Sequence, residues 1–94
     1  MAEIKHQNNE TNGLFEIYSG GKKAGEMTYT WDGEDRFIID HTEVDEEFSG
    51  QGLAKELVYA GVDYARKNNK KVIPVCQYAK ATIHKNAELQ DVLA

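Results

Sequence analysis

Hydrophobic and polar residues alternate along the first half of the chain. Over residues 25–31, Met27, Tyr29 and Trp31 fall on one face of an extended chain, and polar residues fall on the other. A period of two residues is the pattern of a strand buried on one side. Residues 14–18 are similarly rich in aromatic and aliphatic side chains. The pattern predicts two strands, each with one face in a core.

A third alternating run covers residues 36–44, where Phe37, Ile39 and His41 share the predicted inner face. Turn signals separate the three runs, at Ser19-Gly20-Gly21-Lys22-Lys23 and at Asp32-Gly33. Because such short turns join antiparallel neighbours, we expect a meander, preceded by a short strand around Ile4.

The second half changes to a helical period. The apolar residues that recur every three or four positions are Leu53, Leu57, Val58, Gly61, Val62, Tyr64 and Ala65. We expect this helix to end near Asn68 and Asn69, because asparagine tolerates the left-handed conformation of a helix C-terminus. Residues 72–76 are a short apolar run typical of a buried strand. We expect a second helix over residues 79–86.

A strand, a helix and a strand in this order form a βαβ unit, which is expected to be parallel and right-handed. Joined to the antiparallel meander, it gives a mixed α/β (α+β) fold with two main helices packed on one mixed sheet. The 94 residues suit one domain spanning residues 1–94. Pro74 cannot donate a ladder hydrogen bond, so we expect the last strand to be unpaired or splayed on one side there.

Composition narrows the classes of function. The net charge of −5 argues against general affinity for nucleic acid or anionic membranes, and no apolar run approaches the length needed to cross a bilayer. With a lone cysteine, Cys76, and no secretory signal, a cytoplasmic location is the expectation. The three histidines, His6, His41 and His84, lack the spacing of metal ligands, so no metal site is expected.

Charge is distributed unevenly along the chain. Residues 1–47 carry twelve acidic and four basic side chains, a net charge of −8. Residues 48–94 carry four acidic and seven basic side chains, a net charge of +3. An anionic ligand would therefore be attracted to the second half, although a charged surface of this kind is also ordinary solvated surface.

The turn between the third strand and the first helix has the sequence Phe48-Ser49-Gly50-Gln51-Gly52-Leu53-Ala54. Glycines let a backbone approach a ligand closely, and the free N–H groups of a first helical turn favour an anion such as phosphate. A plain tight turn would also use two glycines. The Rossmann fingerprint fails because Lys55 stands where its third small residue is required, and Gly21-Lys22 lacks the rest of a P-loop.

The segment fits the Arg/Gln-x-x-Gly-x-Gly/Ala signature of the GNAT (Gcn5-related N-acetyltransferase) superfamily, at Ser49-x-x-Gly52-x-Ala54. With His41-Thr42-Glu43-Val44 and Cys76-x-Tyr78, it resembles a subfamily of very small GNAT-like acetyl-CoA-binding proteins. The resemblance covers roughly residues 40–86, and Ser49 departs from the usual Arg or Gln.

The resemblance implies acetyl-CoA as the ligand. It assigns the pyrophosphate to main-chain N–H groups of the turn, namely those of Gly50, Gln51, Gly52, Leu53 and Ala54. It places the pantetheine arm beside Thr42 and Val44, with Ser49, Lys55 and Tyr78 as further binding residues. Larger relatives use a tyrosine to protonate the departing thiolate. Near that register this chain has Ile83 and His84, so His84 or Tyr78 could replace it, or no acid is needed.

Three residues are candidates for the chemistry. Cys76, at the end of the predicted strand beside the thioester, could take the acetyl group as a thiolate. His41 and Glu43 are candidate bases, although a histidine sharing a face with apolar residues is more often a packed residue. The predicted function is a minimal acetyltransferase acting on an unknown amine or thiol of a small molecule or protein. The alternatives are a non-catalytic acetyl-CoA sensor or protein-interaction module, and an unrelated α+β module.

Overall fold

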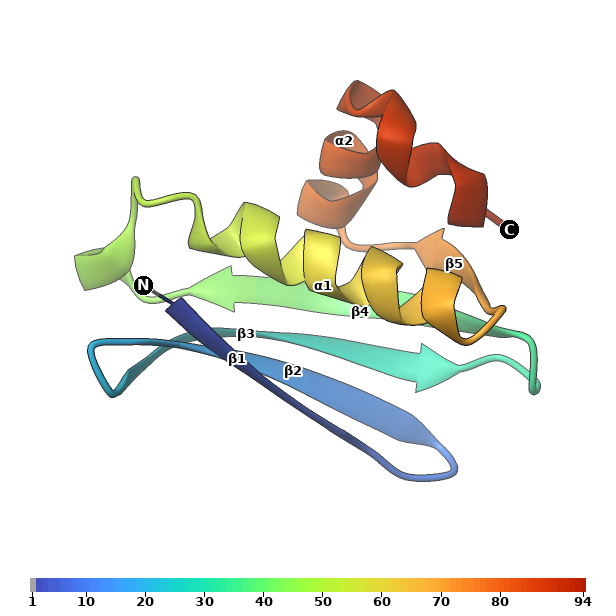
Figure 1. Cartoon of the computed structure of the whole chain (residues 1–94), viewed down its shortest axis with the longest axis horizontal. Coiled ribbons are helices and arrows are strands. Elements are labelled where there is room, and N and C mark those ends of the chain that lie inside the picture. Colours follow the sequence, from blue (N-terminus) through green and yellow to red (C-terminus); the bar gives the residue numbers. More distant parts are fainter. Residues whose placement is uncertain (1) are drawn as a thin grey trace.

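A five-stranded mixed sheet carries two main helices on one of its faces in the computed structural model, which describes residues 2–94 (Figure 1). The strands are β1 (Ala2–Asn8), β2 (Asn12–Ser19), β3 (Lys22–Trp31), β4 (Arg36–Val44) and β5 (Lys71–Pro74). The helices are α1 (Leu53–Lys67) and α2 (Gln77–Lys85), with 3-10 turns η1 (Glu46–Phe48) and η2 (Ala87–Val92). The predicted mixed α/β fold is confirmed, since β1–β4 are antiparallel and β5 is parallel to β4.

The predicted turns join the strands of the meander. Gly20 and Gly21 have φ angles of 58° and 81°, which an L side chain rarely adopts, and they close the hairpin between β2 and β3. The leading strand is longer than predicted, because all seven residues of β1 pair with β2. Its polar residues concealed it, since an edge strand needs few apolar side chains.

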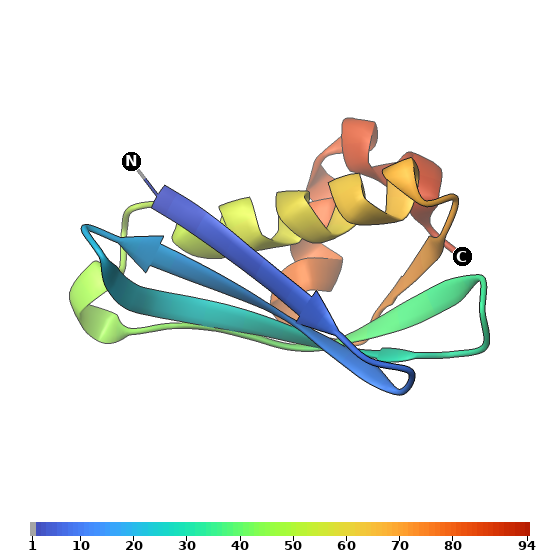
Figure 2. The same ribbon diagram turned by 60° about the horizontal axis from the view of Figure 1, so that its bottom comes forward.

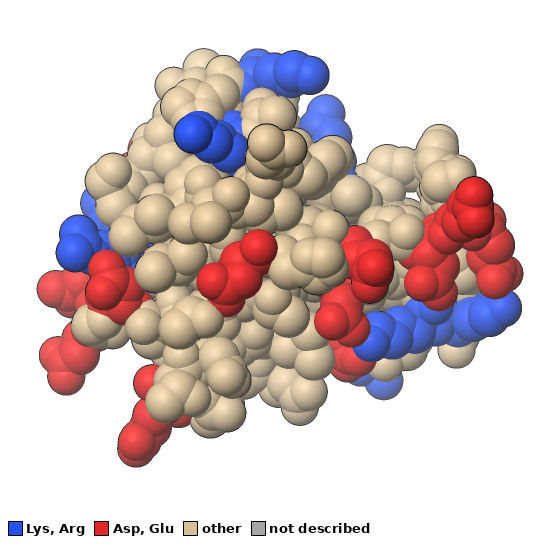
Figure 3. Space-filling model, turned by 180° about the vertical axis from the view of Figure 1, so that it is seen from behind, with Lys and Arg blue, Asp and Glu red and all other residues tan. Residues whose placement is uncertain are grey.

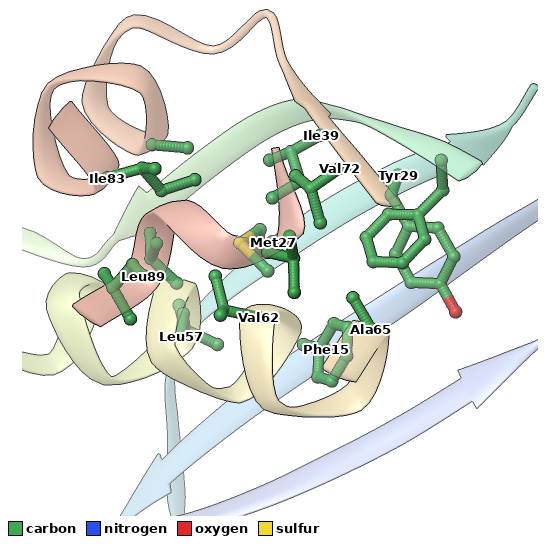
Figure 4. Close-up of a cluster of buried hydrophobic side chains, with 14 of the residues drawn as sticks. Phe15, Met27, Tyr29, Ile39, Leu57, Val62, Ala65, Val72, Ile83 and Leu89 are labelled. Atoms are coloured by element: carbon green, nitrogen blue, oxygen red, sulfur yellow. The ribbon is translucent and has the colours of Figure 1, made fainter. Parts of the chain in front are cut away.

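The core lies between the sheet and the helices (Figures 2 and 4). Met27 projects from β3 towards α1 and is fully buried. A Cβ atom at Gly61 of α1 would stand 2.7 Å from the Met27 Cε atom, so the helix lies close to the sheet at this point. The predicted apolar stripe of α1 is buried apart from Tyr64, which is half-buried.

Both predicted helices form, with one boundary shifted. Helix α1 ends at Lys67, and Asn69 has the predicted left-handed conformation with φ 55°. The strand predicted over residues 72–76 is instead β5, which ends at Pro74, and α2 begins two residues before the predicted 79–86 helix. None of the helices in residues 2–94 is long and apolar enough to cross a membrane.

The predicted inward orientation of His41 is wrong because β4 contains a bulge. Thr28 of β3 pairs with His41 and Tyr29 pairs with Ile39, which leaves Asp40 as an extra residue. The Thr30 hydroxyl donates a 2.7 Å hydrogen bond to the Asp40 carboxylate. An extra residue reverses the alternation that follows it. His41 and Glu43 therefore face solvent, and Thr42 and Val44 are half-buried.

Candidate functional site

The glycine turn leads directly into α1. Ser49 ends η1, where its N–H donates to the Glu46 carbonyl. Gly50 and Gly52 both have positive φ angles, 79° and 76°, and Gly52 is the N-cap of the helix. Apart from the two adjoining residues, no part of the protein lies within 4 Å of the position that a Cβ would take at either glycine. The turn is thus shaped by backbone conformation that glycine allows, with open space beside it.

Six consecutive main-chain amides in this turn have no hydrogen-bond acceptor within residues 2–94. They belong to Gly50, Gln51, Gly52, Leu53, Ala54 and Lys55, while the next amide, of Glu56, donates to the Gly52 carbonyl. The last three stand at the positive end of the α1 dipole. A row of free N–H groups beside open space fits an anion such as a pyrophosphate.

Strands β4 and β5 separate at the base of α2, and β4 continues from there towards η1 and the glycine turn (Figure 1). Their pairing ends at Ile39 and Pro74, after which the amides of Val75 and Cys76 both donate to the Ile39 carbonyl, at 3.1 and 3.0 Å. From Asp40 onwards β4 pairs only with β3. The predicted divergence at Pro74 is present, and it leaves one side of β4 without a strand partner.

Cys76 lies where the two strands separate, as the N-cap of α2. Its Sγ atom is 3.5 Å from the Oγ1 atom of Thr42, across the gap between β4 and α2. Burial alone would raise the pKa of this thiol. Hydrogen bonds from the amides of Ala79 and Tyr78, and from Thr42, outweigh burial and leave the pKa lowered. The thiol therefore has a chemical environment that favours its thiolate.

His41 and Glu43 lie next to each other, on the solvent-facing side of β4. The His41 Nε2 and Glu43 Oε2 atoms are 3.9 Å apart, and both side chains are more than half exposed. Since Thr42 turns the other way, towards Cys76, the sheet separates these two residues from the thiol. No set of three metal-ligating side chains gathers anywhere in residues 2–94.

The remaining predicted binding residues lie on three different elements. Val44 packs at the edge of the core, and Tyr78 of α2 is 41% exposed. Lys55 lies one residue beyond the signature, with its Nζ atom 5.6 Å from the ring centre of Tyr59. Seen from behind, the surface is notched beside a projecting segment that carries several carboxylates, where η1 lies (Figure 3).

Two features of this region were not predicted. The contact between Thr42 and Cys76 depends on the bulge at Asp40, whose only sequence signal is two adjacent polar residues, Asp40 and His41, in an alternating strand. Cys76 was predicted to end a strand, and it instead caps a helix. Strands β1–β4 are joined by turns without intervening helices.

The chain is similar to one known protein family and to several solved structures. The model of the GCN5-related N-acetyl-transferase family matches residues 14–92. A GCN5-like protein from Staphylococcus aureus, solved by NMR, is 38% identical, with a TM-score of 0.74 over 98% of this chain and 87% of that chain. A search of curated proteins finds no match.

More distant structures share the fold. The ribosomal-protein-alanine N-acetyltransferase of Brucella melitensis is 17% identical, with a TM-score of 0.68 over 83% of this chain and 64% of that chain. An aminoglycoside acetyltransferase from an uncultured soil sample is 18% identical, with a TM-score of 0.69 over 80% and 59%. The chain thus spans less than two thirds of the length of these two enzymes. The family match and the Staphylococcus aureus structure show that the chain belongs to the GCN5-related N-acetyltransferase family.

Proposed function

We propose that this protein binds acetyl-CoA and transfers its acetyl group to an amine. The observation that carries the proposal is the row of six free amides, from Gly50 to Lys55, at the N-terminus of α1. A pyrophosphate is an anion with several acceptor oxygens, and such a row supplies donors without any charged side chain. Lys55 would add a positive charge beside them, and Ser49 would contribute only its hydroxyl, because its amide is occupied.

The unpaired side of β4 suits the pantetheine arm. This arm contains amide groups in an extended chain, and an extended chain can add to an open strand through main-chain hydrogen bonds. Thr42 and Val44 lie on the stretch of β4 that lacks a β5 partner. An arm that runs from the glycine turn along this stretch would bring its thioester towards Cys76, with Tyr78 exposed at the rim of the gap.

Cys76 is the residue that we propose to carry the acetyl group. Its thiolate attacks the thioester carbonyl carbon, a new S–C bond forms, and the bond from that carbon to the CoA sulfur breaks. The CoA thiolate leaves and takes up a proton, for which Tyr78 is a candidate donor. A neutral amine then attacks the Cys76 thioester, loses a proton, forms an amide bond and restores the thiolate.

His41 and Glu43 fit a different step. They lie on the face of β4 that is turned away from Cys76, so they do not suit deprotonation of the thiol. An acceptor that approaches from the solvent-facing side of the sheet would meet them first. We propose that they bind a cationic group of the acceptor that is remote from the reacting amine, because the sheet lies between them and the thioester on Cys76.

Intact-mass measurement after incubation with acetyl-CoA tests the covalent step. The wild type is expected to gain one acetyl group, which a small primary amine then removes, and Cys76→Ala is expected to gain none. Equal acetylation of Cys76→Ala would contradict the thiol route. Saturable binding of acetyl-CoA without any transfer would favour the alternative of a non-catalytic acetyl-CoA sensor.

A further inference from the structure

The bulge in β4 determines which side chain faces the thiol. If Asp40 were an ordinary paired residue of β4 and there were no bulge, strict alternation from Ile39 would direct His41 inwards and Thr42 to solvent. With the bulge, Thr42 pairs with the fully buried Met27 and shares its side of the sheet. The hydrogen bond from Thr30 to Asp40 holds the extra residue on the outer face.

Thr42 is the β4 side chain that contacts Cys76. Its Oγ1 atom lies 3.5 Å from Sγ, at the upper range of a contact between oxygen and sulfur. The other groups around the sulfur are the main-chain amides of Tyr78 and Ala79, in the first turn of α2, and the main-chain amide of Thr42 itself. The sulfur is thus held from two elements, by main-chain amides of α2 on one side and by the amide and hydroxyl of Thr42 on the other.

The titratable side chains on β4 and α2 do not take over the role of the Thr42 hydroxyl beside the sulfur. On β4, His41 and Glu43 project from the opposite face of the sheet. On α2, Tyr78 and Lys80 are exposed. None of these four side chains contributes to the lowered pKa of Cys76. Burial raises this pKa, and the hydrogen bonds with Ala79, Thr42 and Tyr78 lower it by more.

We propose that Thr42 is a positioning residue for the Cys76 thiolate. In the thiol form, the S–H group donates to the threonine oxygen. When the thiol loses its proton to solvent, the hydroxyl rotates and donates to the sulfur, which keeps the thiolate at the opening between β4 and β5. The catalytic importance of this contact rests on the proposed role of Cys76, whereas the contact itself can be tested without acetyl-CoA.

The test is the rate of Cys76 alkylation by iodoacetamide as a function of pH. Cys76 is the only cysteine, so the intact mass reports its modification alone. Thr42→Val keeps the shape and removes the hydroxyl, and Thr42→Ser restores it. Thr28→Val is the matched control, because Thr28 lies on the neighbouring strand with its side chain on the opposite face.

We expect the midpoint of the alkylation profile to move to higher pH in Thr42→Val, and to return towards the wild type in Thr42→Ser. At pH 7 the thiolate fraction of Thr42→Val should fall roughly threefold to tenfold, because the thiolate loses a hydrogen bond while the thiol form loses its weaker bond to the same oxygen. Thr28→Val should match the wild type. A folded Thr42→Val protein with an unchanged profile, or a shift that Thr42→Ser does not reverse, would overturn the proposal.

The two proposals fail in different ways. If the alkylation profile shifts as expected but acetyl-CoA never acetylates Cys76, the positioning role of Thr42 stands and the covalent route is wrong. If Cys76 is acetylated at the wild-type rate in Thr42→Val and its alkylation profile is also unchanged, the covalent route stands and Thr42 has no positioning role.

Discussion

Replacing Gly52 by alanine separates the cost of backbone strain from the loss of ligand binding. Gly52 has a φ of 76°, and an L residue in this region costs about 1–2 kcal/mol. For a domain of this size, that cost lowers Tm by roughly 4–15 °C. The added methyl group meets no atom within 4 Å outside the adjoining residues, so backbone strain is the only expected effect on folding.

Gly33→Ala is a control with the same strain. Its φ is 79°, its Cβ position is equally open, and it lies in the turn between β3 and β4. Both variants should lose similar stability in thermal unfolding followed by circular dichroism. Only Gly52→Ala should also weaken acetyl-CoA binding, because either the methyl group stands beside the free amides or the turn relaxes and redirects them.

The expected loss of affinity follows from the number of amides affected. A hydrogen bond to a charged group contributes about 1.5–3 kcal/mol, so misplacing one amide should raise the Kd roughly 10- to 100-fold. Isothermal titration calorimetry of both variants with acetyl-CoA measures this directly. If folded Gly52→Ala binds acetyl-CoA as tightly as Gly33→Ala, the pyrophosphate does not lie at this turn.

Two further predictions concern stability. The Arg66 guanidinium donates two hydrogen bonds to the Asp91 carboxylate and lowers its pKa. The pair therefore stabilises the fold above about pH 4, and this stabilisation is lost as the pH falls through the lowered pKa. Asp91→Asn should therefore lower Tm at pH 7 and weaken its decrease in acid, and an unchanged Tm-versus-pH profile would refute this. Met27→Ala removes a fully buried side chain packed against Gly61 and should cost about 2–5 kcal/mol in urea unfolding. A loss below about 1 kcal/mol would mean that the core closes around the space.

The sequence predicted the elements whose pattern is local. Alternation in β3, the helical stripe of α1 and the glycine hairpin depend on residues close together in the chain, and all three are as predicted. The full length of β1 was missed because His6, a polar residue, stacks on Phe15, with ring centres 3.9 Å apart. Such a contact with a neighbouring strand leaves no periodic signal.

The parts that the sequence did not predict depend on pairing between elements. The bulge at Asp40 arises from the register of β4 against β3, and it reversed the predicted orientation of His41. The apolar residues Val75 and Cys76 suggested a longer strand, but both of their amides turn to the Ile39 carbonyl and end it. The glycine turn has the conformation that the sequence predicted, with open amides, and its role in binding stays a prediction. The contact of Cys76 with Thr42 could not be predicted without knowledge of the bulge.

The most direct test of the proposed function is a titration of the protein with acetyl-CoA followed by amide NMR. Saturable shifts are predicted for the free amides of residues 50–55 and for the unpaired stretch of β4 at residues 42–44. The turn around Gly33, at the far end of β4, should not respond. A flat response at residues 50–55, or shifts concentrated elsewhere, would contradict the acetyl-CoA site and leave the family fold without the proposed activity.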